Sequence, residues 1–301
     1  MFGKVEEEVS FRMKSHVDAA LDMREEFLTQ YSAEDVIRRY MKKTAGYGIS
    51  YLLQHDYGAL YLEVIDRYLP KAKTGQGLRL LEFGCGAGMN LLHLVSVLER
   101  RGTPVEFACG TDFSAALIES AKLEAKEALT ADVASKVRFC VAKNENLLPD
   151  MTKELGITPE SLVGSFDLIF GINTIRYCHR LKSENDNAQQ VHALLKDQGV
   201  CIVIDMNDKF PAFRSRLHDR VTKDKESCYL PSLEKYASPF EAAKFEILRK
   251  EHFCWIPHSA GKSLTTIMLA MTPALNSVAR KHAMRSLVIS RKNGSVNPAG
   301  R

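Results

Sequence analysis

The 301-residue sequence has no apolar stretch long enough to cross a membrane, and it begins with acids, MFGKVEEEVSFRMK, where a secretory signal would be apolar. Its seven cysteines include no C-x-x-C pair, which argues against a zinc site or a disulfide framework. Basic residues occur without long runs, and the net charge is only +4, so nucleic acid is not favoured as a partner. We therefore expect a cytoplasmic protein without a bound metal. Its oligomeric state stays open.

An apolar run that breaks into three glycines is the most informative stretch, LRLLEFGCGAGMN at residues 78–90. The pattern predicts a buried strand, a tight turn at Gly84, Gly86 and Gly88, and the start of a helix whose backbone amides can face a ligand. The third glycine comes one residue too early for a G-x-G-x-x-G fingerprint, and no Lys-Ser or Lys-Thr of a phosphate-binding loop follows. Glu82 precedes the turn, where its carboxylate could polarise the turn or meet a cationic ligand group.

The run E-F-G-C-G-A-G resembles motif I of the class I S-adenosylmethionine (SAM) methyltransferases. A second feature fits the same family, because Asp112 ends the apolar run VEFACGTD, 24 residues after Gly88 (112 − 88). In that family an acid at this place binds both ribose hydroxyls of SAM, and a carboxylate is a suitable acceptor for two neighbouring hydroxyls. The resemblance implies SAM as the cofactor.

Apolar strand-like runs alternate with helical patterns from residue 79 onward, which predicts a doubly wound, mostly parallel sheet. Five strands are expected at 79–84, 105–111, 137–142, 166–171 and 199–205. Two more strand-like runs, FEILRKEHFCW and RSLVISRK, complete a seven-stranded α/β sheet whose last strand is antiparallel, as in class I methyltransferases. Residues 1–70 read as an N-terminal helical cap and 71–292 as the SAM-binding domain. Acceptor-binding insertions are expected near 206–232 and 257–283, and a loose tail at 293–301.

The resemblance extends to the other cofactor contacts. Phe113 would pack on the adenine ring, and Asn173 follows strand 166–171 at the end where cofactor and acceptor meet. Family members often have an acid after the third strand, but this chain has Lys143, so Asn144 or a backbone carbonyl would accept from the adenine amine. Tyr47 and Tyr51 lie in a glycine-flanked segment. They either pack in the core or form a lid that reaches the cofactor or the acceptor.

Polar residues that could carry the chemistry follow strand 166–171 in GINTIRYCHR. His179 is either a base beside the methyl group or a surface residue at a helix start, and Tyr177 is the other candidate near the nucleophile. Arg176 and Arg214 could bind an acidic or phosphorylated acceptor, although solvated surface charge is the default. His258 lies at the edge of an apolar segment, 263–275, that either roofs an acceptor pocket or packs in the core.

We therefore predict a SAM-dependent methyltransferase that transfers a methyl group by in-line displacement to an oxygen, nitrogen or carbon atom of a small molecule. The D/N-P-P-Y/F sequence of enzymes that methylate adenine and glutamine amines is absent. Two alternatives remain open: a methyltransferase that acts on RNA or protein, and a regulatory protein that binds SAM without chemistry.

Overall fold

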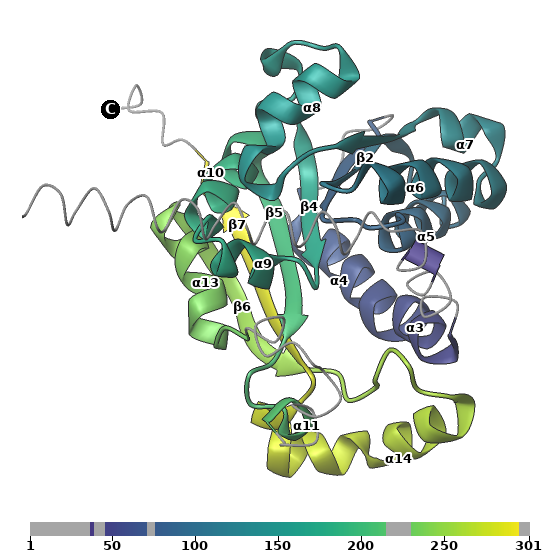
Figure 1. Cartoon of the computed structure of the whole chain (residues 1–301), viewed down its shortest axis with the longest axis vertical. Helices are drawn as coiled ribbons and strands as arrows, with labels where there is room; N and C mark the ends of the chain where they lie inside the picture. Colours follow the sequence, from purple (N-terminus) through teal and green to yellow (C-terminus); the bar gives the residue numbers. More distant parts are fainter. Residues whose placement is uncertain (1–36, 39–45, 71–75, 215–229, 295–301) are drawn as a thin grey trace, which may run out of the picture.

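The computed structural model describes residues 37–38, 46–70, 76–214 and 230–294. At its centre is a seven-stranded sheet with the order β3-β2-β1-β4-β5-β7-β6 (Figure 1). The strands are β1 (Leu78–Phe83), β2 (Val105–Asp112), β3 (Val137–Val141), β4 (Phe166–Ile172), β5 (Leu195–Met206), β6 (Phe245–Phe253) and β7 (Arg285–Lys292). Only β7 runs antiparallel to its neighbours, β5 and β6. The predicted fold class is therefore confirmed.

Helices cover both faces of the sheet. Successive strand residues point to opposite faces, so neighbouring residues of one strand belong to different core clusters. Leu80 packs with η1 (Leu52–Tyr57, a π-helix), α4 (Gly58–Tyr68), α5 (Met89–Arg100) and α6 (Ala115–Ala128). Leu81 packs with α8 (Leu147–Leu155), α10 (Glu184–Leu194) and α13 (Leu233–Ala242). Short helices are α3 (Tyr47–Tyr51), α7 (Ala131–Ser135), α9 (Ile175–Arg180) and α11 (Pro211–Arg214), with 3₁₀ turns at Asn144–Asn146, Pro159–Ser161 and Arg280–His282.

The predicted cap is described only from residue 46 onward, apart from 37–38. Its α4 helix places Leu60, Tyr61, Val64 and Ile65 on one face, the spacing of an amphipathic helix, and all four are buried in the same core as the sheet. This part of the cap is therefore packed on the main domain. Residues 1–36 and 39–45, like 295–301 of the predicted tail, lie outside the described residues.

The two predicted acceptor insertions differ in how much of them can be described. In the first, α11 is the last element before residues 215–229, which lie outside the described residues. The second contains α14 (Lys262–Ala279), whose only buried residue is Thr265. Met268 packs against the core, but Leu264, Ile267 and Met271 are exposed, so core packing does not explain these three apolar side chains.

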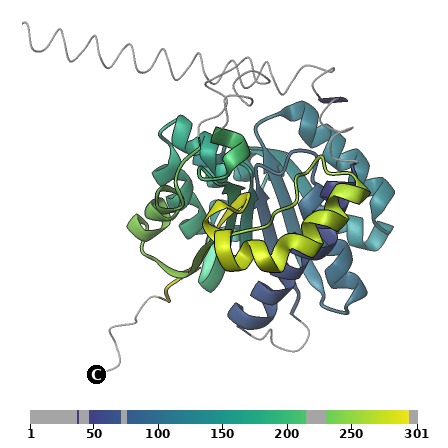
Figure 2. The same cartoon turned by 90° about the horizontal axis from the view of Figure 1, so that it is seen from below.

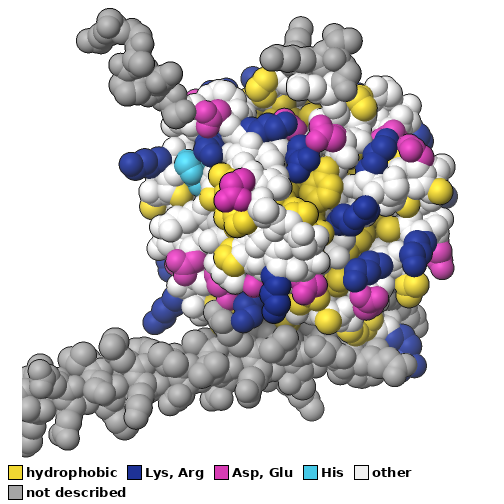
Figure 3. Space-filling model, turned by 90° about the horizontal axis from the view of Figure 1, so that it is seen from above, with side chains coloured by type: hydrophobic (Ala, Val, Ile, Leu, Met, Phe, Trp, Pro, Cys, Tyr) yellow, Lys and Arg dark blue, Asp and Glu magenta, His cyan; other side chains and the backbone are white. Residues whose placement is uncertain are grey.

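The carboxyl ends of the parallel strands share one edge of the sheet, and β7 begins at that edge because Arg285 lies opposite Met206. Figure 2, seen from below, looks onto this edge and shows α14 lying across it. On the opposite side, seen in Figure 3, basic and acidic side chains are interspersed. None of the described helices is long and apolar enough to span a membrane. No cluster of three or more metal-ligating side chains occurs among the described residues.

Candidate active site

The turn after β1 has the backbone that its glycines predicted. Gly84, Gly86 and Gly88 have φ angles of 63°, 54° and 81°, in the left-handed region that favours glycine. Space is limited as well: a Cβ on Gly84 would lie 2.1 Å from Oγ1 of Thr174, and one on Gly88 would lie 2.8 Å from the Phe139 ring. Glycine is therefore required both for the turn and for its packing against β3 and the end of β4.

Asp112 ties this turn to the end of β2. Its Oδ2 accepts a 2.9 Å hydrogen bond from the Gly86 N–H, and its Oδ1 accepts one of 2.9 Å from the Ser114 N–H. Burial raises the pKa of the carboxyl group to about 6, although the backbone hydrogen bonds oppose that shift. The Phe113 N–H also bonds this carboxyl group, so about one of its four acceptor positions remains for a ligand hydroxyl. The ribose contact remains a prediction.

Glu82 faces the start of α5. Its Oε1 accepts from Nδ2 of Asn90 at 3.1 Å, and its Oε2 accepts from the Leu91 N–H at 3.0 Å. The Tyr61 hydroxyl of α4 donates to Oδ1 of Asn90 at 3.3 Å, so the cap joins the same network. Burial raises the pKa of Glu82 to about 8. These contacts are with the start of α5, and both predicted roles of Glu82 stay predictions.

The network partners Asn90 and Tyr61 did not stand out in the sequence. The available signal was Asn90 itself, a polar residue that begins an otherwise apolar helix face. Its amide needs partners once it is buried.

Asn173 provides the clearest sign of a ligand at this edge. It adopts a φ of 56°, and its N–H bonds the Ile204 carbonyl at 2.7 Å, which fixes the residue at the end of β4. Its Oδ1 is buried without a hydrogen-bond partner among the described residues. A buried acceptor left unpaired is costly unless a ligand donates to it. The residues therefore fit SAM, which carries an ammonium group and ribose hydroxyls as donors.

The predicted adenine contacts lie close to this turn. Asn144 donates from Nδ2 to Oγ1 of Thr174 at 2.8 Å, and its carbonyl accepts from Nδ2 of Asn187 at 2.9 Å. Asn144 is thus held beside the end of β4. Phe113 is half-buried next to Asp112. Both residues stay predictions.

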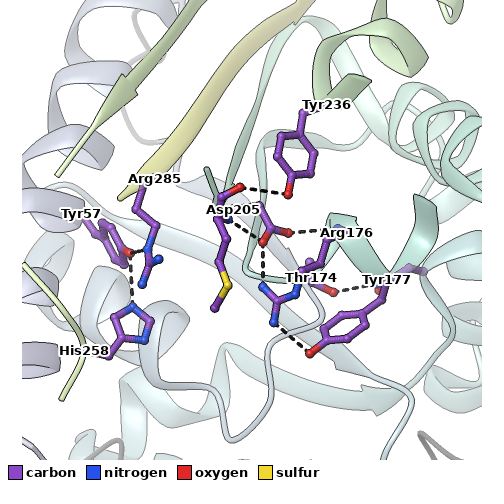
Figure 4. Close-up of polar contacts among 10 residues, drawn as sticks. Tyr57, Thr174, Arg176, Tyr177, Asp205, Tyr236, His258 and Arg285 are labelled. Atoms are coloured by element: carbon purple, nitrogen blue, oxygen red, sulfur yellow. Dashed lines mark hydrogen bonds and ion pairs between the residues drawn. The ribbon is translucent and has the colours of Figure 1, made fainter. Parts of the chain in front are cut away.

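Arg176 forms a buried ion pair. Its Nη1 bonds Oδ1 of Asp205 at 2.7 Å, its backbone N–H bonds Oδ2 at 3.0 Å, and its Nη2 donates to the Tyr177 hydroxyl at 2.9 Å (Figure 4). The charge predicted to meet an acidic acceptor is therefore already compensated. Asp205 lies 29 residues away in the chain, and only the pairing of β4 with β5 brings the two together.

His179 is buried rather than on the surface, so the surface interpretation is wrong. Its Nδ1 lies 3.6 Å from Oε1 of Glu184, and its ring meets the Tyr236 ring edge-on at 5.7 Å. Its Nε2 is buried without a partner among the described residues. Burial lowers the pKa of His179, which keeps the imidazole neutral and able to take a proton. Its catalytic role, and that of Tyr177, are still predictions.

His258 belongs to a second polar group at the same edge. Its Nε2 lies 3.4 Å from the Tyr57 hydroxyl, which also accepts a 3.1 Å hydrogen bond from Nε of Arg285. Figure 4 shows these three side chains converging on one side of the edge, with the Arg176 ion pair on the other. Sequence reasoning did not single out Arg285. The available signal was a charged residue opening an apolar strand.

The remaining predicted residues lie further out. Tyr47 is exposed, and the Tyr51 ring stacks at 4.4 Å on the His55 ring. In the described part of the chain, no hydrogen bond or ring contact joins either tyrosine to the glycine turn. Gly48 between them packs on the loop at 257–260, since a Cβ there would lie 2.5 Å from the Pro257 carbonyl oxygen. The Arg214 side chain lies outside the described residues.

A sheet of this order, with one antiparallel strand and a left-handed glycine turn after β1, defines the Rossmann-like class I methyltransferase architecture. The family model described as a methyltransferase domain matches residues 74–261, and the chain belongs to that family. The predictions of methyltransferase activity and of SAM as the cofactor are thereby confirmed.

Curated relatives include two fungal polyketide synthases. The citrinin polyketide synthase of Monascus ruber is 29% identical over 151 residues, which are 50% of this chain and 5% of that protein. The non-reducing polyketide synthase sor2 of Hypocrea jecorina is 30% identical over 129 residues, which are 43% of this chain and 4% of that protein. The chain thus spans about a twentieth of the length of these relatives.

Solved structures support the fold. The CMeT domain of the citrinin polyketide synthase superposes with a TM-score of 0.57 at 18% identity, covering 88% of this chain and 58% of that one. A geranyl diphosphate methyltransferase in complex with GPP and sinefungin gives a TM-score of 0.51 at 16% identity, covering 78% of each chain.

Proposed function

We propose that this methyltransferase acts on a small-molecule acceptor bound at the carboxyl edge of the sheet. The observation that carries the proposal is the presence of two polar groups at that edge. One consists of the glycine turn, Asp112 and the unpaired oxygen of Asn173. The other consists of Tyr57, His258 and Arg285. The names of the similar proteins, a polyketide synthase and a geranyl diphosphate methyltransferase, also point to small organic acceptors.

The first polar group would hold the cofactor. Gly86 has no side chain to block the ligand, Asp112 would accept from the ribose, and Asn173 would accept from the ammonium group. Bound SAM supplies an electrophilic methyl group on a positively charged sulfur. The chain then has to keep water out and hold the acceptor atom in line with that methyl group.

A base is needed only where the acceptor atom carries a proton that must leave. Two imidazoles predicted from the sequence, His179 and His258, are among the described residues. His179 fits the role because its buried Nε2 is unpaired and its ring is neutral. His258 already contacts the Tyr57 hydroxyl, so its basic nitrogen is partly engaged.

The test is transfer of label from methyl-labelled SAM. The full chain is incubated separately with small-molecule extract, total RNA and a peptide pool, and Gly86→Val serves as the control that should not bind the cofactor. We expect label in small molecules only. Label in RNA or peptide alone would contradict the proposal. Tight SAM binding without transfer to any pool would favour the non-catalytic alternative.

A further inference from the structure

Arg285 is a buried cation without an anionic partner. Its side chain opens β7, and the residue is only 2% exposed. Its Nε donates to the Tyr57 hydroxyl, but its Nη1 is buried and has no hydrogen-bond partner, and no ion pair joins it to a carboxylate in the described part of the chain. Removing a guanidinium from water costs several kcal/mol, so such a charge is normally paired.

Other arginines of the described residues show the usual arrangement. Arg176 is 11% exposed at its side chain and bonds Asp205, and Arg249 on the neighbouring strand β6 bonds both Glu251 and Glu63. Each of these cations has a carboxylate within hydrogen-bond distance. Arg285 is more deeply buried than either of them and lacks one.

The groups around Arg285 do not supply the missing charge. Burial raises the pKa of the Tyr57 phenol and of the Cys254 thiol, each to about 12, so both are neutral. Asp56 lies next to Tyr57 in η1, and burial raises the pKa of its carboxyl group. Its carboxyl group bonds the Cys254 thiol and forms no ion pair with Arg285 among the described contacts.

The position of Arg285 directs it to the ligand edge. Because β7 is antiparallel, its first residue lies between Met206, at the end of β5, and Phe253, at the end of β6. Tyr57 is placed against it by η1, a π-helical segment of the kind that often occurs at functional sites. His258 reaches the same hydroxyl from the loop before α14. Side chains of β7 and of this loop thus meet at the Tyr57 hydroxyl of the cap (Figure 4).

We propose that Arg285 binds an anionic oxygen of the methyl acceptor, a carboxylate or a phosphate, and that Tyr57 and His258 hold the guanidinium in place. The assignment rests on the proposed small-molecule function and narrows it to acidic acceptors. It also moves the anion-binding role from Arg176, whose charge Asp205 compensates, to an arginine on another strand. The guanidinium suits both oxyanions because its N–H groups form a planar fork.

The experiment measures anion binding to the full-length chain saturated with S-adenosylhomocysteine. Malonate, its neutral analogue malonamide and inorganic phosphate are titrated calorimetrically into the wild type, Arg285→Met and Arg285→Lys. We expect malonate or phosphate to bind the wild type and to bind Arg285→Met about ten-fold more weakly or worse, the effect of losing one charge-assisted contact. Malonamide should show no such difference. The anion that binds the wild type more tightly, malonate or phosphate, indicates whether the acidic group of the acceptor is a carboxylate or a phosphate.

Arg249→Met is the matched control, since it removes a paired arginine from the adjacent strand and should leave anion binding unchanged. Arg285→Lys keeps the charge and provides a folded variant if the methionine variant is unstable. Two results would overturn the inference: no binding of either anion to the wild type, or loss of S-adenosylhomocysteine affinity in Arg285→Met. Failure of the proposed function would look different, because labelled methyl groups would reach no small molecule even if malonate or phosphate bound.

Discussion

Replacing Glu82 by glutamine should change how the stability of the protein depends on pH. The carboxyl group is buried and bonded by Asn90 and the Leu91 N–H, and burial raises its pKa from 4.5 to about 8. Glutamine has the same shape, cannot ionise, and can keep both contacts if the Asn90 amide turns over. The substitution therefore removes an ionisable group and leaves the packing of the side chain unchanged.

The sign follows from the direction of the shift. A carboxyl group whose folded pKa lies above its unfolded pKa adds stability that is complete below about pH 4.5 and is lost as the pH rises through 8. The shift is about 3.5 units (8 − 4.5). At pH 7 the unfolded chain has lost the proton that the folded chain keeps, which costs about 3 kcal/mol relative to pH 4.

Urea unfolding followed by circular dichroism at pH 5, 6, 7 and 7.5 measures the effect. The advantage of Glu82→Gln over the wild type should grow with pH by about 2–3 kcal/mol across this range. Asp112, with a pKa near 6, adds a slope of the same sign that both proteins share. Glu119→Gln, an exposed change on α6, is the control. If the difference in unfolding free energy between the variant and the wild type stayed constant with pH, Glu82 would not be a protonated carboxyl group in the folded protein.

Three further substitutions test the site. Asp112→Ala should weaken SAM binding by about 1.5–3 kcal/mol in calorimetry, the effect of losing hydrogen bonds to a charged group; a change of a few tenths would place the ribose elsewhere. Gly86→Val should give a folded protein by circular dichroism without measurable SAM affinity, because a branched side chain opposes the φ of 54° and fills the ligand's space. Asp205→Ala should lower the unfolding free energy by about 3–5 kcal/mol, because it leaves the buried Arg176 unpaired; retained stability would mean that water replaces the carboxylate.

The order of the strands and helices and the position of the glycine turn could be predicted, because local sequence patterns determine them. Strands alternate with helices at the intervals that the apolar runs indicate, and the three glycines of the turn adopt the backbone angles that only glycine tolerates easily. Asp112 could be placed at the end of β2 for the same reason, since it ends an apolar run. These features depend on neighbours in sequence.

The contacts that decide the chemistry depend instead on which strands lie side by side. Nothing near Arg176 in sequence shows that Asp205 neutralises it, because that contact requires β4 and β5 to be adjacent. The apolar residues of α14 suggested burial, yet most of them are exposed, since the helix lies across the edge rather than in the core. For Arg285 the local signal, a charged residue that opens an apolar strand, did not reveal its burial between β5 and β6, which follows from the reversed direction of β7.

The two polar groups of the site come from different parts of the sequence, and the reversed direction of β7 brings the last of these parts, Arg285, back to the same edge of the sheet. The turn and its partners are encoded between Leu78 and Asn173, whereas the second polar group is assembled from a segment before that block, at Tyr57, and one after it, from His258 to Arg285. If the second group binds the acceptor as proposed, substitutions in the flanking segments should alter what is methylated while the methyl donor stays the same.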